Sequence, residues 1–333
     1  MNTTRRPPRL AVAAIAAVAL LLAGCSGTSS SSAGGEGGNA TVSLGTQPWI
    51  GYGQWYVAQD QGILEKNGVN VDMVQLNTDA DKISAFASGQ INAANVATHT
   101  AMMMKEAGVD LKIVLIEDYS ETADAMIAGP DVTSVSQLKG KKVAYEQGST
   151  SDLLLHAALD SAKLTMDDIQ PVPMAASDAA AALISKQVDV AITYEPYITT
   201  ALEQDSALKP IFTGSDAPGL ISDALVVSGK LLSDSPQTVQ ALVDSWGEAV
   251  TYYNSDTEAA RGVIAKQVGE DASALSSAFD GVRFFDKAQN ATAFTGEYVS
   301  DALPVAERVA TEAGLLTKPV DIAALYDSQF VTN

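Results

Sequence analysis

Three aspartates, Asp118, Asp124 and Asp223, carry the strongest chemical signal in this sequence. They lie in stretches that we predict to connect two parts of the fold, where no helix start accounts for a carboxylate. A carboxylate in such a place accepts hydrogen bonds from N–H groups and attracts positive charge. No arginine occurs between Arg9 and Arg261, so this part of the chain lacks the forked guanidinium that commonly recognises oxyanions.

Aromatic side chains gather within residues 47–56, whose sequence is QPWIGYGQWY. Trp49 and Tyr52 fall in the turn between a predicted strand and a predicted helix, where pockets of α/β proteins commonly occur. A flat ring there covers an apolar or cationic group by stacking or cation–π contact, although packing between loop and sheet would use the same residues. Trp55 and Tyr56 fall inside the helix, where we expect core packing.

Hydroxyl groups precede the helix that we expect over residues 151–163. Gly148, Ser149 and Thr150 lead into it, and the free N–H groups of a helix start, together with hydroxyls, either cap the helix or bind an anion. These three residues are therefore candidates for ligand contact.

Thr98 and Glu195 occupy corresponding helix starts in two similar halves of the chain. We expect Thr98 and its neighbour His99 to face a ligand from the first half and Glu195 to face it from the second. A glutamate in a first turn also interacts favourably with the helix dipole, so a purely local role stays open for Glu195. Asp81 and Asp178 begin another corresponding pair of helices, and there we expect capping.

These groups favour a small nitrogen-containing ligand with N–H donors or positive charge, such as an amine, an amidine, a urea-like compound or an aminopyrimidine. Its acceptors and walls would be Asp118, Asp124, Glu195, Asp223, Trp49 and Tyr52. The alternative is a small oxyanion such as an alkanesulfonate, taurine or nitrate, which would depend on helix N-termini and hydroxyls.

The sequence holds few groups for catalysis or metal binding. It has two histidines, His99 and His156, and one cysteine, with no His/Cys cluster, no G-x-S-x-G segment and no phosphate-binding glycine loop. We therefore predict no catalytic residue, no metal site and no cofactor. A pair such as Ser149 with His99 leaves an enzyme on the same fold as an alternative, and a sensor or structural protein is a third.

Short β-like runs alternate with helical stretches from residue 41 to residue 116, which is typical of a parallel sheet covered by helices. The same order begins again near residue 142, and residues 84–94 (SAFASGQINAA) align with residues 181–191 (AALISKQVDVA) at an offset of 97. We predict an α/β fold of two lobes, with a parallel-rich sheet in each and a cleft between them beyond the carboxyl ends of the strands.

The chain is predicted to cross between the lobes twice, in residues 118–124 and 219–223. Lobe I then consists of residues 41–120 plus 223–333, and lobe II of residues 121–222. The pattern after the second crossing is helical, over residues 236–254, 257–268, 272–279 and 295–313. This helical C-terminal extension should pack on lobe I, and Pro236 suits its first helical turn.

The N-terminal segment resembles an export signal. Arg5, Arg6 and Arg9 precede an uncharged apolar run, which is the order of a signal peptide. The run ends in LAGC at residues 22–25, which resembles the lipobox of bacterial lipoproteins. We expect residues 1–24 to be removed, Cys25 to be lipidated, and the Ser/Gly-rich residues 25–40 to tether the exported protein to the outer face of the cell membrane.

Acidic residues outnumber basic ones by 40 to 20. Such a surface repels phosphate backbones, so nucleic acid is an unsuitable partner. A single cysteine forms no internal disulfide, and the fold must therefore be stabilised by its core. We expect a monomer.

Several segments together resemble one protein family. They are residues 47–56, the helix AQDQGILEKNG at 58–68, QLKGKKVA at 137–144 with Gly148-Ser149, and VDVA at 188–191 before Tyr194-Glu195-Pro196. The chain resembles the nitrate/sulfonate/taurine family of ABC-importer solute-binding proteins. It resembles also the binders of thiamine pyrimidine precursors. The resemblance implies a type II periplasmic-binding-protein fold, a small solute held in a closing cleft, and docking on an ABC permease with a cytoplasmic ATPase.

Overall fold

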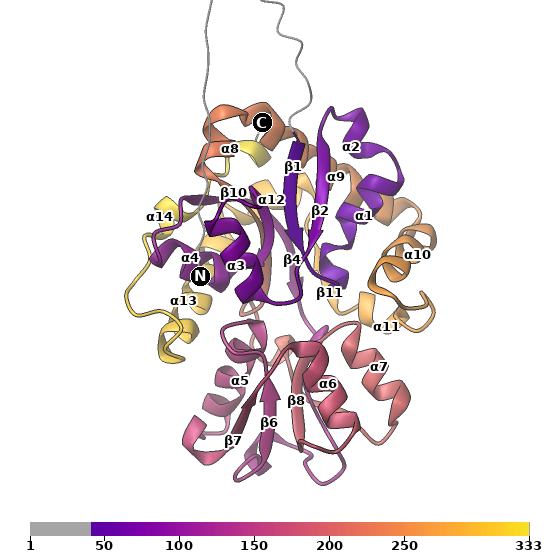
Figure 1. Cartoon of the computed structure of the whole chain (residues 1–333), viewed down its shortest axis with the longest axis vertical. Coiled ribbons are helices and arrows are strands. Elements are labelled where there is room, and N and C mark those ends of the chain that lie inside the picture. Colours follow the sequence, from indigo (N-terminus) through magenta and orange to yellow (C-terminus); the bar gives the residue numbers. More distant parts are fainter. Residues whose placement is uncertain (1–40, 333) are drawn as a thin grey trace, which may run out of the picture. The chain divides into compact units, whose positions relative to one another are not determined.

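The computed structural model describes residues 41–332. The predicted signal peptide, Cys25 and the tether lie outside the described residues. The described chain contains two mixed β-sheets, one of six strands and one of five, each flanked by helices (Figure 1). The predicted α/β class with two sheets is confirmed, and each sheet combines parallel and antiparallel pairs.

The first sheet has the strand order β11-β4-β10-β3-β1-β2. β1 pairs in parallel with β2 and β3, whereas β10 runs antiparallel to β3 and β4. The central strand β3 is buried along its whole length, as expected for a strand covered on both faces. The strand bounds are β1 Thr41–Thr46, β2 Asn70–Gln75, β3 Ala93–Ala97, β4 Leu111–Ser120, β10 Ser222–Ser228 and β11 Val282–Phe284.

The second sheet has the strand order β7-β6-β8-β5-β9. Pro171 and Pro173 lie on β7, an edge strand, where a missing backbone N–H interrupts no ladder. The strand bounds are β5 Asp124–Ala128, β6 Lys142–Tyr145, β7 Gln170–Pro173, β8 Val190–Tyr194 and β9 Lys209–Thr213.

The two sheets repeat the same arrangement. The order β2-β1-β3-β10-β4 in the first corresponds to β7-β6-β8-β5-β9 in the second, and in each the first three strands pair in parallel. This repeat has the element order that the 97-residue offset indicated. The chain passes from the first sheet to the second between β4 and β5 and returns between β9 and β10.

Helices cover both faces of the sheets. Helices α1 to α4 connect strands of the first sheet, and α5 to α7 do so in the second (Figure 1). Their bounds are α1 Gly53–Asp60, α2 Ile63–Lys66, α3 Asp79–Ala87, α4 Thr98–Glu106, α5 Thr150–Ser161, α6 Ala176–Ile184 and α7 Tyr197–Gln204. No helix within residues 41–332 has both the length and the apolar character that a membrane crossing requires.

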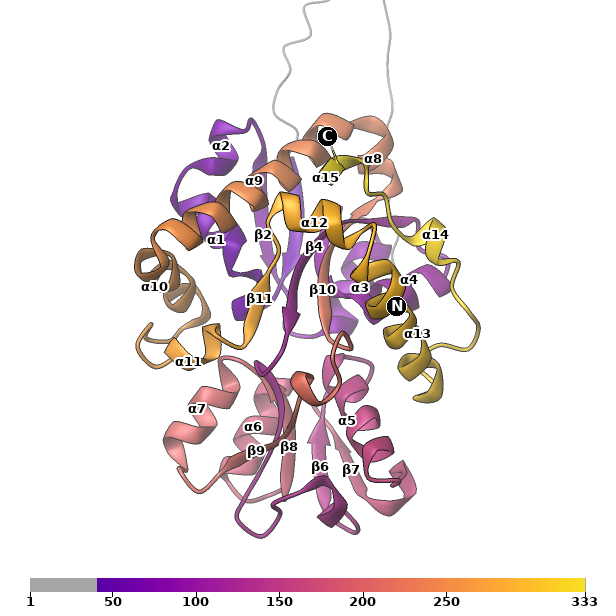
Figure 2. The ribbon, with the colours of Figure 1, turned by 180° about the vertical axis from the view of Figure 1, so that it is seen from behind.

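The C-terminal region packs on the first sheet, as Figure 2 shows for α9 and α12. The ring of Trp246 in α9 packs against that of Trp55 in α1 at a tilt of 53°, with centroids 5.3 Å apart, and both residues are almost fully buried. Pro236 opens α9, as predicted. The bounds are α8 Gly229–Asp234, α9 Pro236–Ser255, α10 Thr257–Val268, α11 Ser276–Phe279, α12 Lys287–Ala293, α13 Leu303–Glu312, α14 Ile322–Leu325 and α15 Gln329–Thr332.

The prediction of an entirely helical C-terminal region was wrong in one place. Residues 282–284 form β11, which pairs antiparallel with the end of β4. A three-residue strand carries too little periodicity to be seen in the sequence, and it forms because β4 otherwise has an open edge there. The helix expected over 272–279 is correspondingly reduced to α11.

Candidate functional site

A narrow cavity lies between the two sheets, at the carboxyl ends of several strands. Its free volume is about 10 Å³, room for about one water molecule, so the lobes are closed on each other. Loops of the first sheet contribute Gln47, Trp49, Tyr52, Asp79, Ala97 and Asp223, and the second sheet contributes Asp124, Thr150 and Tyr194.

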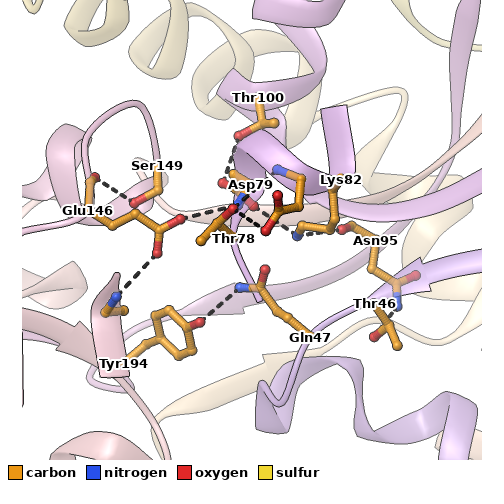
Figure 3. A network of polar contacts seen from close by, with 12 residues as sticks. Thr46, Gln47, Thr78, Asp79, Lys82, Asn95, Thr100, Glu146, Ser149 and Tyr194 are labelled. Atoms are coloured by element: carbon orange, nitrogen blue, oxygen red, sulfur yellow. Dashed lines mark hydrogen bonds and ion pairs between the residues drawn. The ribbon is translucent and has the colours of Figure 1, made fainter. Parts of the chain in front are cut away.

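Aromatic rings form one wall of this cavity. Trp49 meets Tyr194 edge to face, with ring centroids 5.7 Å apart, although the two rings belong to different lobes. The hydroxyl of Tyr194 accepts a hydrogen bond of 3.2 Å from Nε2 of Gln47 (Figure 3). The structure thus places Trp49 and Tyr52 in the lining, and it adds Tyr194, which the sequence did not single out.

Of the three aspartates at the predicted crossings, Asp124 and Asp223 line the cavity beside Asp79, and Asp118 lies directly behind them. Asp124 begins β5 and Asp223 lies near the start of β10, and each is only 4% exposed. Asp118 is fully buried in β4, directly opposite Asp223 in the antiparallel ladder. Neither carboxylate oxygen of Asp118 has a hydrogen-bond partner within residues 41–332. The three aspartates at the predicted crossings therefore come together at one side of the cleft.

Burial sets the electrostatics of this group. It raises the pKa of Asp124 to about 7 and that of Asp223 to about 7. The charges of Glu195 and Asp79 add to the first shift, and those of Asp124 and Asp79 add to the second. The pKa of Asp118 also lies well above its usual range, through burial and the charges of Asp223, Glu117 and Asp124. Carboxyls of this kind either hold protons near neutral pH or need a positive partner to ionise.

Lys82 is the buried cation nearest to the cavity, and it already has a partner. Its Nζ lies 2.9 Å from Oδ1 of Asp79 and donates to the backbone carbonyl of Asn95 over 3.0 Å. Burial would raise the pKa of Asp79, but the charge and hydrogen bond of Lys82 lower it below its usual value. The ion pair thus leaves Asp124 and Asp223 as carboxyls that face the cavity without a lysine of their own.

Polar contacts join the two lobes around the cavity (Figure 3). The backbone N–H of Asp79 donates to Oε1 of Glu146 over 3.1 Å, and Oε2 of the same carboxylate accepts from the N–H of Ala176. His99 of α4 interacts with the backbone of Gly148 and Ser149 in the other lobe, and burial lowers its pKa to about 4, so the imidazole is neutral. His99 therefore holds the closed state rather than lining the cavity.

Three of the candidate residues at helix starts stabilise the fold and do not line the cavity. Ser149 accepts from the N–H of Ser151 as the cap of α5 and donates to the carbonyl of Glu146. Gly148 has φ +81°, a conformation that glycine adopts without strain. Thr98 bonds to Tyr298 and Ser222, each at 2.8 Å, and lies outside the lining. Thr150 is the member of this group that lines the cavity.

The predicted place of Glu195 in a helix first turn was wrong. Its backbone N–H donates to the carbonyl of Ala123 and so continues the pairing of β8 with β5, and α7 begins only at Tyr197, after Pro196. The carboxylate of Glu195 accepts from the N–H of Thr199 and lies outside the cavity lining. Burial raises its pKa to about 7.

Sequence reasoning missed Asp79, Lys82 and Glu146. Asp79 and Glu146 fall in loops that the strand order places at the cleft. That position was the signal from which the sequence could have identified them. Within the described chain, no three His, Cys, Asp or Glu residues are grouped so as to hold a metal ion. The hydroxyl of Ser149 is engaged in its capping contacts, and it forms no hydrogen bond with His99 among the described residues.

The chain is similar to named binding proteins. A Brucella abortus protein named as a binding protein, with no ligand stated, is 26% identical over 223 residues, which cover 66% of this chain and 69% of that protein. The taurine-binding periplasmic protein of Escherichia coli is 24% identical over 57% of this chain and 59% of its own length.

Solved structures show the same fold. The periplasmic aliphatic sulphonate binding protein SsuA from Escherichia coli superposes with a TM-score of 0.71 at 23% identity, over 87% of this chain and 92% of that one. The desulfurization enzyme DSZB also shares the fold, with a TM-score of 0.64 at 16% identity over 89% of this chain and 98% of that one. The predicted periplasmic-binding-protein fold is confirmed.

The family model described as NMT1/THI5 like matches residues 50–260, well over half of the chain. The matched segment begins beside Trp49 and includes both passages between the sheets and most of the cavity lining. The chain belongs to the NMT1/THI5-like family.

Proposed function

We propose that this chain is the extracytoplasmic solute-binding protein of an ABC importer, which captures a small solute by closure of its two lobes and delivers it to the permease. The family, the periplasmic-binding-protein fold and a cavity lined from both lobes support this function. Its partners are the permease with its cytoplasmic ATPase. As part of the proposal, the exported chain is monomeric and held at the outer face of the cell membrane through lipidated Cys25.

Closure follows from contacts that exist only when the lobes meet. The Asp79–Glu146 and Gln47–Tyr194 hydrogen bonds and the Trp49–Tyr194 ring contact all join one lobe to the other. A solute that touches both lobes favours the closed state by its differential affinity for it. The permease then recognises the closed pair of lobes.

The solute is a small nitrogen-containing compound, such as an amine, an amidine, a urea-like compound or an aminopyrimidine. One observation carries this assignment: Asp124 and Asp223 line the cavity with Asp118 buried behind them, whereas the described lining contains no arginine. An ammonium or amidinium group would satisfy these carboxyls by charge-assisted hydrogen bonds. The rings of Trp49, Tyr52 and Tyr194 would surround it by cation–π contact.

A small oxyanion is the second candidate. Relatives of this chain are named for sulfonates and taurine, and Thr150 at the start of α5 lines the cavity. Carboxyls whose pKa is near 7 can also donate hydrogen bonds to an anion once they are protonated. This alternative requires binding to strengthen as pH falls, whereas a cationic solute requires the reverse.

An enzyme on the same fold is the alternative of another class, and the similarity to DSZB is the observation that raises it. The cavity of this chain holds carboxyls, aromatic rings and hydroxyls, and its neutral His99 is occupied between the lobes. Turnover of a bound compound, followed by mass spectrometry, would replace the transport assignment.

Thermal unfolding against a ligand panel tests the proposal. Residues 41–332 belong to one compact unit, and a ligand that binds only the folded chain raises its Tm. The panel pairs methylammonium, acetamidinium, urea and 4-aminopyrimidine with nitrate, taurine and ethanesulfonate. A Tm rise with a nitrogen compound that is lost in Asp223→Asn supports the assignment, and a rise with the anions alone replaces it by the second candidate. If neither group of compounds raises the Tm, the solute-binding assignment loses its support.

A further inference from the structure

We infer that the cleft exchanges a proton for the positive charge of its solute: in the solute-free protein Asp118 and Asp223 share a proton across the β4–β10 ladder, and a docking ammonium or amidinium group releases it to solvent. The inference rests on the proposed function. The balance of charge is simple, because the pair loses one proton and gains one cation as its neighbour.

The register of the ladder carries the first step. Asp223 of β10 is the direct cross-strand partner of Asp118 of β4. Cross-strand partners lie about 4.5–5.5 Å apart at their Cβ atoms, and like charges in such a pair repel. Asp118 is fully buried and Asp223 is 4% exposed, so water screens this repulsion little. Two ionised carboxylates cannot both be accommodated there without a counter-charge.

The surroundings supply little counter-charge, because the charge of Lys82 lowers the pKa of Asp223 but does not outweigh its burial. Glu117 on β4, Asp124 on β5 and Asp79 on α3 add negative charge around the pair, and Tyr52 faces Asp223 from the loop before α1. The basic group among these neighbours is Lys82 of α3, which is held 2.9 Å from Asp79. Glu117 accepts the indole N–H of Trp55 over 2.7 Å, so that donor does not reach Asp118 either.

The carboxyl group of Asp118 lacks a well-placed hydrogen-bond donor. Among residues 41–332 neither of its carboxylate oxygens has a hydrogen bond of good geometry, and nor does the indole N–H of Trp49, although that N–H lies near enough to lower the pKa of Asp118. Trp49 and Asp118 lie together against Gly51, where an added Cβ would collide with both. A buried carboxylate left in this state is costly, whereas a proton shared with Asp223 gives it a donor. The raised pKa values of Asp118 and Asp223 agree with this geometry.

The two aspartates therefore have different roles. Asp223 lines the cavity and would touch the solute, whereas Asp118 lies behind the lining and acts through Asp223. Asp118 is thus a positioning residue that determines the charge of the cleft. An oxyanion would bind only while the proton stays on the Asp118/Asp223 pair. A cation instead binds to the negative pair that remains after the proton has left.

The proton can be observed before any solute is known. In the chain of residues 38–333 labelled with ¹³Cγ-aspartate, the carboxyl resonances should show one group of the Asp118/Asp223 pair still protonated at pH 6. Asp118→Asn should lower the midpoint of Asp223 by more than about one pH unit, because the neighbouring charge is removed. Asp72→Asn, at an exposed position of β2, is the matched control and should leave the midpoint unchanged. Ordinary midpoints near 4 for both residues would overturn the inference whether or not any compound binds.

Exchange is then measured by calorimetry with methylammonium and acetamidinium in phosphate and in ADA buffer at pH 6.5. Binding should release up to one proton, seen as a heat that depends on the buffer, and Asp118→Asn should release less. If a cation binds and the proton stays on the pair, the exchange is wrong while the solute assignment stands. If only ethanesulfonate or taurine binds, with proton uptake, the exchange and the nitrogen assignment both fail while the role in import remains.

Discussion

Asp79 and Glu146 connect the two lobes, because the backbone N–H at the start of α3 donates to the carboxylate at the end of β6 over 3.1 Å. The same carboxylate accepts the N–H of Ala176 at the start of α6 over 3.3 Å. One side chain thus joins the helix starts of both lobes, beside the cavity rather than in it. This relationship exists only when the cleft is closed.

We expect Glu146→Ala to shift the chain toward the open state. A hydrogen bond to a charged group contributes about 1.5–3 kcal/mol, so the affinity for solute should fall about 10-fold or more. Small-angle scattering should show a larger radius of gyration for the solute-free variant. Glu65→Ala, at an exposed position of α2, is the control, and an unchanged radius with unchanged affinity would show that Glu146 does not hold the lobes together.

Stability should fall as pH rises from about 4 to about 7. Burial raises the folded-state pKa of Asp124, Asp223 and Glu195 to about 7, whereas unfolded carboxyls titrate near 4. The folded chain therefore binds more protons in this window, and each group destabilises it by up to about 1.4 kcal/mol per pH unit. Below about pH 4, where these carboxyls are protonated in both the folded and the unfolded chain, this loss of stability is absent. Above about pH 7, where they are ionised in both, it is complete.

Urea unfolding at pH 5 and pH 8 measures this difference. The free energy of unfolding should be lower at pH 8, and Glu195→Gln should reduce the dependence because it removes one titrating group. Asp131→Asn, at an exposed loop position, should leave the slope as it is. A stability that increases with pH over this range would contradict the buried, proton-holding carboxyls.

Lys82→Met should destabilise the chain strongly. Lys82 is 1% exposed and Asp79 is 6% exposed, and removal of one partner from a buried ion pair costs about 3–5 kcal/mol. The double variant Lys82→Met, Asp79→Asn should recover part of this loss, since it leaves no uncompensated charge. Lys66→Met, which removes an exposed pair with Glu248, should cost less than about 1 kcal/mol. Equal losses at the two lysines would be inconsistent with a buried pair.

The fold was predictable because both its secondary structure and its internal repeat can be recognised in the sequence. Strands and helices alternate in regular order, and the 97-residue repeat reappears as the shared strand order of the two sheets. The cleft expected beyond the carboxyl ends of the strands is where the structure places Trp49, Tyr52, Asp79, Ala97, Thr150 and Tyr194. The position of these residues at the cleft depends on the topology alone, so a correct strand order was sufficient to predict it.

The choice of residues within those loops was less successful, because side-chain partners come from distant parts of the chain. Thr98 bonds to Tyr298, 200 residues away, and Glu146 accepts from the N–H of Asp79, 67 residues away. An alignment of halves places a residue on a helix but not the direction of its side chain. Glu195 shows the same limit, since strand pairing with Ala123 extends past the expected helix start.

Trp49 should report solute binding by its fluorescence. The chain has three tryptophans, of which Trp49 lines the cavity, whereas Trp55 and Trp246 pack against each other in the core. A solute that binds beside Trp49 in the cavity changes the surroundings of one indole and leaves the other two unchanged. We expect a change in emission with a binding compound of the panel that is abolished in Trp49→Phe. The Trp246→Phe variant should keep this change, because Phe fills most of the core volume. If the emission change disappeared in Trp246→Phe but remained in Trp49→Phe, the solute would bind elsewhere in the fold.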